Sequence, residues 1–337
     1  MLRYTVLSMG EPAGTSPEVM LKTLSELSGI AGVGIIAVGD EGVVRKTSAD
    51  LNLELPFSAY VDSMEALEKA ENLNENFIFY VSSSINMERF EYGVVSAETG
   101  RAVFESLKTS IDIIQNGLGH TLVTSPVSGK ALEAAGYKER TVNDMLRRFA
   151  SSDRLKSMIR AGNINIFGLT HRCAIRTAIT SVTRENIISS LIDIDSLFVS
   201  SFFDKSKPIA VSSLNPLLPG NGWTGPDEDG AIIPAIEIVR KLGINAVGPI
   251  APEFLFERAA EGEFSAILVM AATEGLAAAS AAAPGGAFFL TWGLPFIRVG
   301  TISDIGLEHA GKGIARIDKF VASVHAGLDL READALA

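Results

Sequence analysis

The sequence predicts an α/β protein with two domains. Short apolar strands alternate with amphipathic helices along most of the chain, which is the order that builds a mainly parallel sheet. The chain of 337 residues is long enough for two domains of ordinary size. Hydrophobic residues make up 47% of it and charged residues 20%, a composition typical of globular proteins with large cores. No repeat or low-complexity linker is visible, so regular elements are expected to cross the domain boundary.

The expected strands are apolar runs bounded by turn residues. They lie at residues 4–9, 33–38, 77–81, 121–123, 209–213, 266–271, 288–292 and 296–299. The first of them is apolar on both sides, as strands of a covered parallel sheet are. Residues 157–159 and 164–169, joined through Gly162, predict a β-hairpin that interrupts the alternation.

The expected helices follow helical spacing of apolar residues or good helix starts. They lie at residues 17–27, 64–71, 96–115, 130–135, 141–150, 184–198, 227–242, 252–261, 302–311 and 314–329. Ser16 with Pro17 suits a helix start, and Thr141 with Asp144 fits a capping box in which aspartate replaces the usual glutamate or glutamine. The alanine-rich segment 275–286 predicts a loop or one short turn, because glycines and a proline surround its alanines.

The longest expected loop, residues 212–230, follows a strand and ends where an acidic turn opens a helix at Asp227. It contains four glycines and three prolines. Connections of this kind usually take about 2–6 residues, and longer ordered ones usually have a task. Because ligands bind at the carboxyl ends of strands in open parallel sheets, we expect this loop to line a cleft. The alternative is an ordinary strand-to-helix connection.

Charge and composition exclude several classes of protein. The net charge of −11 and the pI of about 5.0 argue against a nucleic-acid surface. The single cysteine, Cys173, excludes an intramolecular disulfide and a cysteine-built zinc site; it is expected to be a small buried hydrophobe, with a nucleophile beside His171 as the alternative. The apolar segment 267–292 is interrupted by Glu274 and Pro284, so no membrane span is expected. Without a signal-peptide pattern, a cytoplasmic location is expected.

Short motifs then occur in a fixed order along the chain. They are Gly10-Glu11-Pro12-Ala13-Gly14, Pro17-Glu18, Pro126-Val127, Ala135-Gly136, Thr170-His171, Leu214-Asn215-Pro216, Gly248-Pro249, Gly293-Leu294-Pro295-Phe296-Ile297-Arg298 and Ala310-Gly311-Lys312-Gly313. Their order resembles the 4-hydroxythreonine-4-phosphate dehydrogenase (PdxA) family over essentially the whole chain. The first and the eighth of these strings are the most specific.

The resemblance implies two α/β/α domains of the isocitrate/isopropylmalate dehydrogenase-like type with an interdomain cleft. The first domain is expected to combine residues 1–126 with 295–337, and the second, dimer-forming and on the cofactor side of the cleft, to cover 127–294. The resemblance also implies a homodimer, a small phosphorylated substrate and the cofactor NAD. In the family a divalent metal held by three histidines assists the oxidation of a phosphorylated hydroxy acid, which then loses CO₂.

Departures from the family pattern concentrate on the metal. Only His171 stands at a family ligand position, and Leu217 and Ala272 replace the other two histidines. A catalytic zinc usually needs three protein ligands, so we expect the standard metal site to be absent. The alternative is a carboxylate-rich site for Mg²⁺ or Mn²⁺ beside His171. Its possible oxygen ligands are Asp144, Asp227, Glu253 and Glu274.

The substrate residues depart from the family as well. Residues 141–144 replace the family's Gly-His-Thr-Glu string, Ser280 and Phe289 replace a lysine and an asparagine, and Lys130 is displaced by one position. The remaining candidates are carried over by resemblance. They are His171, Asp144 and Lys130 for catalysis, Arg298 and Asn143 for the substrate phosphate, and Gly14, Asn215, Gly220 and Gly222 for the cofactor. Arginine suits phosphate because its donors form a fixed fork; the alternative for Arg298 is a salt bridge at a strand end, and for His171 a core histidine.

Two functions follow from these observations. The first is an NAD(P)-dependent dehydrogenase acting on a 4-hydroxythreonine-4-phosphate-like substrate at a degenerate metal site. The second is a catalytically silent homologue that binds a small ligand or a partner protein. The retained glycine and proline loops and Arg298 favour the enzyme, and the lost histidines favour the silent homologue.

Overall fold

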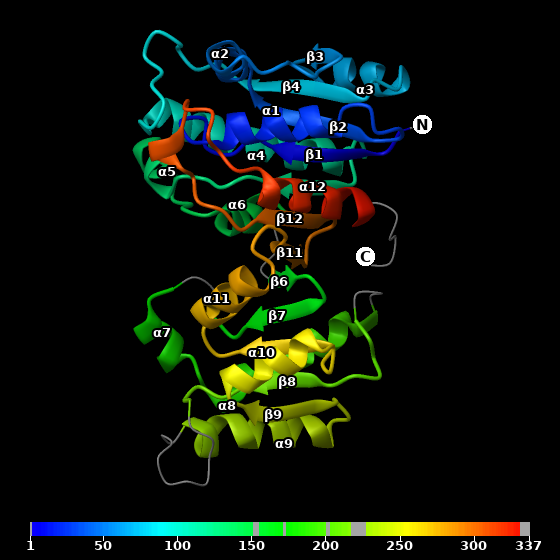
Figure 1. Cartoon of the computed structure of the whole chain (residues 1–337), viewed down its shortest axis with the longest axis vertical. Coiled ribbons are helices and arrows are strands. Elements are labelled where there is room, and N and C mark those ends of the chain that lie inside the picture. The colour runs from blue at the N-terminus through cyan, green and yellow to red at the C-terminus, as the bar shows by residue number, and fades with distance from the viewer. Residues whose placement is uncertain (1, 151–154, 171–172, 200–202, 217–226, 331–337) are drawn as a thin grey trace. The chain divides into compact units, whose positions relative to one another are not determined.

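The computed structural model describes residues 2–150, 155–170, 173–199, 203–216 and 227–330 (Figure 1). The chain forms two compact units. Unit 1 combines residues 2–156 with residues 288–330, and unit 2 covers residues 157–287. The helices at residues 129–134 and 142–149 pack against the helix at residues 97–115 within unit 1.

Unit 1 contains a mainly parallel sheet in the order β3-β4-β2-β1-β5-β12-β11. Its strands are β1 (Tyr4–Ser8), β2 (Gly34–Asp40), β3 (Ala59–Val61), β4 (Phe77–Ser83), β5 (Thr121–Thr124), β11 (Phe288–Trp292) and β12 (Ile297–Thr301). Only the β11–β12 pair is antiparallel among these described pairings. Strand β1 is buried along its whole length, as its apolar character on both sides predicts.

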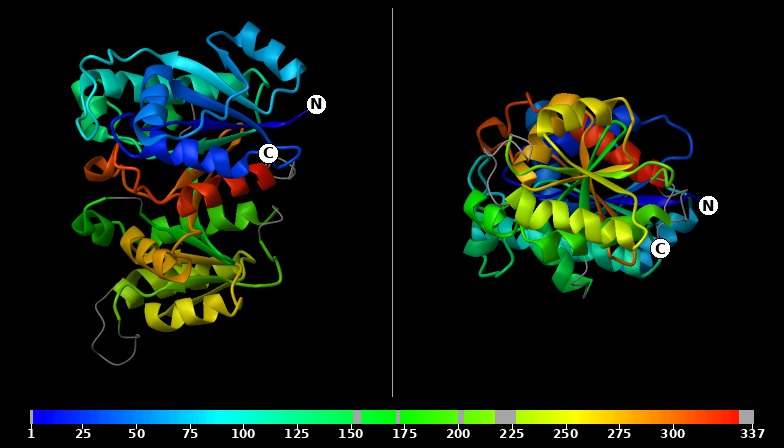
Figure 2. Two further views of the ribbon diagram at one scale, coloured as in Figure 1. Left: turned by 45° about the horizontal axis from the view of Figure 1, so that its top comes forward. Right: turned by 90° about the horizontal axis from the view of Figure 1, so that it is seen from below.

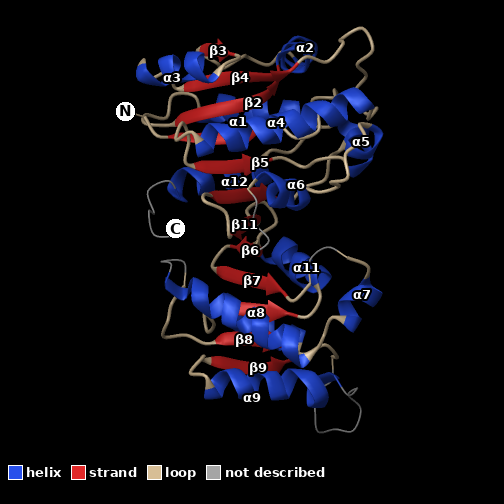
Figure 3. Cartoon of the chain, turned by 180° about the vertical axis from the view of Figure 1, so that it is seen from behind, coloured by secondary structure: helices blue, strands red, loops and turns tan. Residues whose placement is uncertain are grey.

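Helices cover both faces of the sheet of unit 1. They are α1 (Ser16–Leu27), α2 (Glu41–Leu51), α3 (Met64–Asn72), α4 (Ala97–Gln115), α5 (Gly129–Ala134), α6 (Val142–Phe149) and α12 (Asp318–Leu330). Helix α4 packs on β1, β2, β4 and β5, and its core includes Val6 and Leu122. Helix α12 packs on the opposite face, where Gly327 lies against Thr5 and Val123. Figure 1 shows α1 and α12 in front of the strands, and the view from behind in Figure 3 shows α4.

Unit 2 contains five strands in the order β6-β7-β10-β8-β9. They are β6 (Lys156–Ala161), β7 (Ile164–Gly168), β8 (Ile209–Ser212), β9 (Ala246–Ile250) and β10 (Ala266–Val269). Strands β6 and β7 form the expected antiparallel hairpin, and the other described pairings are parallel. Its helices are α7 (Ile175–Thr180), α8 (Arg184–Ser196), α9 (Ile233–Lys241), α10 (Pro252–Ala260) and α11 (Ala272–Ala282), with a 3₁₀ turn at Leu197–Val199 and a π-helical turn at Glu228–Ile232.

The helices of unit 2 also lie on both sides of its strands (Figure 2). Helices α8 and α9 pack together on one face, and α10 and α11 on the other. Both units therefore have the α/β/α layering that was expected, and the α/β fold class is confirmed. In the described part of the chain, no helix combines the length and the apolar character that crossing a bilayer requires.

Two helix predictions were wrong. The segment expected to be a loop forms most of α11, because Gly275 serves close packing on β7: a Cβ there would lie 2.9 Å from Ile166 Cγ2. Conversely, residues 302–311 contain only the 3₁₀ turn Leu307–His309. Gly306 adopts a left-handed conformation with φ +64°, which stops a helix at that point.

Candidate functional site

The carboxyl ends of β7, β10 and β8 lie at one edge of the sheet of unit 2, because these strands are parallel neighbours. Thr170 follows β7, residues 213–216 follow β8, and Met270 to Glu274 follow β10. In open α/β sheets, ligands bind at this edge. We refer to these segments together as the unit 2 edge.

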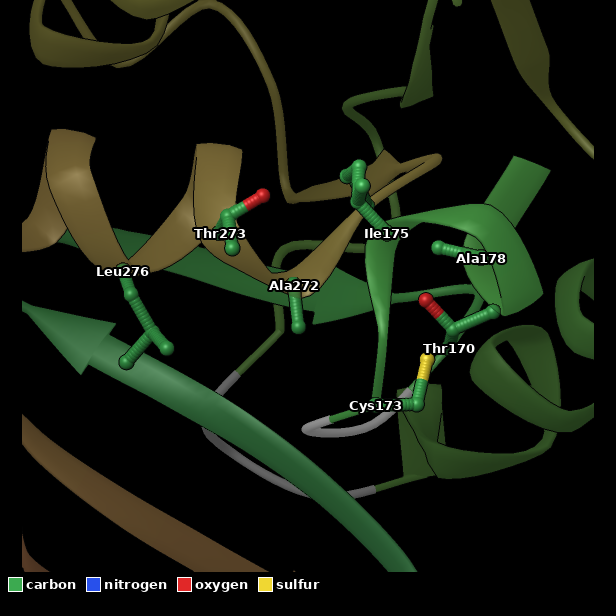
Figure 4. A pocket seen from close by; sticks show the side chains of 8 residues that line it. Thr170, Cys173, Ile175, Ala178, Ala272, Thr273 and Leu276 are labelled. Carbon is green, nitrogen blue, oxygen red and sulfur yellow. The ribbon is translucent and has the colours of Figure 1, made fainter.

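A cavity of about 390 Å³ opens at the unit 2 edge (Figure 4). Its lining residues are Thr170, Cys173, Ile175, Ala178, Ala271, Ala272, Thr273 and Leu276. Ala272, which the resemblance predicts to replace a histidine, adds a methyl group to the wall. The expectation of a buried cysteine was wrong: Cys173 is exposed and lines this cavity, because the start of α7 leaves its neighbours at the surface.

The described residues of this edge do not fit a three-histidine metal site. His171 and Leu217 lie outside the described residues, and Ala272 has no ligand atom. Among the residues that the structure describes, no group of three or more His, Cys, Asp or Glu side chains could hold a metal ion. Two of the alternative oxygen ligands are placed elsewhere: Asp144 caps a helix of unit 1, and Glu253 is exposed in the first turn of α10.

Glu274 is a titratable group of the unit 2 edge whose pKa is shifted by its surroundings. It is the third residue of α11, and its carboxyl group bonds with the Ser212 hydroxyl and the Ala271 N–H. Burial nevertheless raises the pKa of Glu274 to about 7. Its Oε1 is buried and has no hydrogen-bond partner among the described residues. A carboxyl group of this kind can hold or accept a proton near neutral pH.

Glu228 braces the loop that follows β8. Its side chain is fully buried, and its Oε1 accepts from the backbone N–H groups of Leu214 at 2.9 Å and Asn215 at 2.8 Å. Its Oε2 accepts from Asn215 Nδ2 at 2.9 Å. Asn215 itself stays partly exposed. Sequence analysis missed Glu228, because it is the middle residue of three acidic ones and nothing in that run indicates which side chain turns inward.

Arg298 lies on β12 and is 7% exposed. Its Nε and Nη2 donate to Thr124 Oγ1 at 2.9 and 2.6 Å, and its Nη1 donates to Thr291 Oγ1 at 3.5 Å. Thr124 is the last residue of β5, so the guanidinium lies close to the carboxyl end of that strand. Gly300 makes room for it, since a Cβ there would come within 2.3 Å of the guanidinium.

The other expected site residues of unit 1 have local structural roles or lie at the surface. Asp144 completes the predicted capping box: its Oδ2 accepts from Thr141 N at 3.0 Å and Thr141 Oγ1 at 2.8 Å. Lys130 is exposed on α5, and Asn143 is partly buried in the first turn of α6.

Close packing at Gly129 and Gly14 shows what surrounds the expected site residues of unit 1. The starts of α5 and α6 are neighbours, because a Cβ on Gly129 would lie 3.0 Å from Arg140 O. Gly14 is buried, and a Cβ there would lie 2.4 Å from Ile305 O, so close packing of the backbone accounts for this glycine. Gly220 and Gly222 lie outside the described residues.

Comparisons with known proteins agree with this picture. A curated relative from Halalkalibacterium halodurans, named "Putative D-threonate 4-phosphate dehydrogenase", is 28% identical over 311 residues, which cover 92% of this chain and 91% of the relative. The crystal structure of 4-hydroxythreonine-4-phosphate dehydrogenase from Klebsiella pneumoniae superimposes with a TM-score of 0.82 at 20% identity, covering 98% of this chain and 100% of that one. The corresponding enzyme from Burkholderia phymatum gives a TM-score of 0.73 at 23% identity, with 98% of each chain covered.

These proteins are named as dehydrogenases, in agreement with the expectation that the chain is an enzyme. The two structural likenesses by themselves establish the fold. The family model described as "Pyridoxal phosphate biosynthetic protein PdxA" matches residues 33–326. Because this match spans most of the chain, the protein belongs to the PdxA family, as the order of its motifs indicates.

Proposed function

We propose that the protein is an NAD(P)-dependent dehydrogenase that oxidises a small phosphorylated hydroxy acid without the three-histidine metal site of its family. The observation that carries this proposal is the family match over residues 33–326, together with relatives named for 4-hydroxythreonine 4-phosphate and D-threonate 4-phosphate. The substrate is therefore a compound of this class, a hydroxy acid or amino acid with a terminal phosphate.

Arg298 is the proposed phosphate-binding group. Its guanidinium is charged at every physiological pH, and burial strengthens the field that it exerts at the carboxyl end of β5. The adjacent starts of α5 and α6 add polar side chains from Lys130 and Asn143. Asn215 is the described residue that we assign to the cofactor, because it is partly exposed at the unit 2 edge and its amide is held in place.

The proposed chemistry contains no step through a metal. Oxidation of the hydroxyl group transfers a hydride from carbon and releases a proton from oxygen. When bound, the nicotinamide supplies the hydride acceptor. The proton needs an acceptor whose pKa is near the working pH. The pair formed by Glu274 and Ser212 meets this need, because burial raises the pKa of Glu274 to about 7.

A direct assay tests the function. Purified protein is mixed with NAD⁺ or NADP⁺ and either D-threonate 4-phosphate or 4-hydroxythreonine 4-phosphate, and formation of the reduced cofactor is followed by absorbance with and without a chelator. We expect turnover that the chelator does not abolish. Turnover that disappears with the chelator and returns with a divalent metal would contradict the metal-free part of the proposal.

An Arg298→Lys variant tests the phosphate assignment. Lysine keeps the charge and loses the fork, so kcat/KM should fall by about 100-fold, mainly through KM. The same variant should retain the circular dichroism spectrum of the parent. An unchanged KM would remove Arg298 from the site.

The methyl-lined cavity at Ala272 favours a second candidate, a silent homologue that binds a small ligand. In that case calorimetry detects binding of the same phosphorylated compounds while no cofactor is reduced. The degenerate metal site has its own test. Leu217→His with Ala272→His should bind zinc stoichiometrically by elemental analysis, and neither single variant should, because coordination needs its ligands together.

We also propose a homodimer, the commonest closed assembly. Light scattering should give twice the chain mass of 35.8 kDa. A monomer at working concentration would contradict this.

A further inference from the structure

A single buried carboxylate holds Leu214 and Asn215, two of the first residues after β8. Glu228 accepts from two successive backbone N–H groups, those of Leu214 and Asn215, and from the side-chain amide of Asn215. The Ser213 hydroxyl donates to Asn215 O at 2.5 Å and closes the turn from the other side. The position and the side-chain rotation of Asn215 are therefore both constrained.

The carboxylate also decides which way the Asn215 amide faces. An ionised glutamate only accepts hydrogen bonds, so the group of Asn215 that faces Glu228 must be the Nδ2 donor. The flipped amide would place Oδ1 against Oε2, which is repulsive. Asn215 consequently turns its acceptor, Oδ1, away from Glu228. Among the described residues no hydrogen bond to Oδ1 is formed, and the residue as a whole is partly exposed.

The chemistry of this arrangement limits what can bind. An outward carbonyl oxygen next to a buried carboxylate accepts a hydrogen bond and repels an anion. A phosphate oxygen offers no proton at neutral pH and carries the wrong charge. A hydroxyl or amide N–H group fits.

We infer that Glu228 is a positioning residue that orients Asn215, and that the ligand group contacting Asn215 Oδ1 is a neutral hydrogen-bond donor rather than a phosphate. The inference rests on the proposed function and refines it: the part of a dinucleotide at this loop is a ribose hydroxyl or the carboxamide, and the pyrophosphate lies elsewhere.

A swap of hydrogen-bonding groups tests this orientation. In Glu228→Gln, the amide oxygen can still accept from the two backbone N–H groups, but its Nε2 now faces Asn215. Asn215 then turns Oδ1 inward and presents its NH₂ group to the ligand. The hydrogen bonds from the two backbone N–H groups are kept, while the group that Asn215 presents to the ligand changes from an acceptor to a donor.

Adding Asn215→Asp to Glu228→Gln restores the original polarity. The aspartate accepts from the new amide with one oxygen and presents the other as an acceptor. By calorimetry with NAD⁺, or with NADP⁺ if the parent prefers it, we expect Glu228→Gln to raise Kd by about tenfold or more. The double variant should bring Kd back to within about threefold of the parent.

Glu237→Gln is the matched control, because it removes the same charge from an exposed position of the adjoining α9. Its Kd should not change. Hydrogen exchange of the Leu214 and Asn215 backbone amides should show protection in the parent and in Glu228→Gln, and loss of protection in Glu228→Ala.

The outcomes separate this inference from the proposed function. Suppose that the parent binds dinucleotide. The inference is then overturned, and the proposed function stands, if folded Glu228→Gln has an unchanged Kd or if the double variant binds no better than the single one. A parent that binds neither dinucleotide overturns both.

Discussion

The loops after β1 and β8 both leave the carboxyl end of a parallel strand, and a buried glutamate braces each of them. In unit 1, Glu11 is fully buried and its Oε1 accepts from Ala13 N at 3.1 Å, while its Oε2 has no hydrogen-bond partner among the described residues. In unit 2, both oxygens of Glu228 accept hydrogen bonds, three in all.

The two loops differ in what lies on their other side. The loop after β1 closes on its own unit, since methyl groups at Gly10 and Gly14 would lie within 2.5 and 2.4 Å of backbone oxygens. The loop after β8 leaves Asn215 partly exposed and Pro216 exposed. In the described residues, the loop after β1 therefore packs against backbone of its own unit, whereas the first residues after β8 reach the surface.

The largest expected effect comes from Gly14→Ala. Its new methyl group would lie 2.4 Å from Ile305 O, a backbone atom that cannot move aside, so unfolding by urea should show a loss of more than about 3 kcal/mol. Gly230→Ala is the control: it has open space around it, and its stability should change by less than about 1 kcal/mol. A Gly14→Ala protein as stable as the parent would mean that the loop after β1 is not packed tightly against Ile305.

The second prediction concerns Glu274, a carboxylate of the unit 2 edge. Burial raises its pKa from 4.5 to about 7, so the protonated form is favoured in the folded protein. The stability that this form contributes is complete below pH 4.5 and is lost as the pH rises to about 7, which amounts to about 3 kcal/mol.

Glu274→Gln removes this titration. Between pH 4.5 and 7 the parent should lose stability relative to the variant, as measured by urea unfolding at a series of pH values. Parallel curves for the two proteins over this range would show that Glu274 titrates normally.

Glu11→Gln should give a smaller change of the same sign. Burial raises the pKa of Glu11, and the Ala13 N–H and the Thr99 hydroxyl oppose this by bonding to its carboxylate. The protonated form of Glu11 therefore stabilises the folded parent at low pH, and this contribution is lost as the pH rises through the pKa of the folded state. Glu11→Gln cannot titrate, so its stability does not fall for this reason. Urea unfolding of both proteins at pH 5 and pH 8 measures this difference. A parent that is more stable relative to the variant at pH 8 than at pH 5 would contradict the prediction.

The smallest effect is expected at the start of α6, where the capping carboxylate of Asp144 is partly exposed. Asp144→Ala removes half of a capping box and should cost about 1 kcal/mol of unfolding free energy. Because Oδ2 of Asp144 serves the helix start and its Oδ1 pairs with Arg147 of the same helix, kcat/KM should stay within about threefold of the parent. A drop of 100-fold at unchanged stability would give Asp144 the catalytic role that its sequence position suggests.

Particular elements show how far sequence reasoning reached. The β6–β7 hairpin and the capping box at Thr141 were predicted correctly, because both depend on neighbours in the chain. Helix α11 was missed, since the glycine that seemed to break it serves packing against β7. Cys173 was expected inside and lies at the surface, because a side chain's exposure depends on the elements that surround it.

The sequence by itself determined the alternation of strands and helices and the family, and it predicts that Leu217 and Ala272 replace two metal-binding histidines. These properties are local patterns or residue identities, so they can be read without coordinates. Only the tertiary structure decided which carboxylates are buried, that Glu228 and not its acidic neighbours holds Asn215, and that Gly14 packs against Ile305. Burial and hydrogen bonding join residues that are distant in the chain, and the energies of these contacts have no trace in the order of the residues.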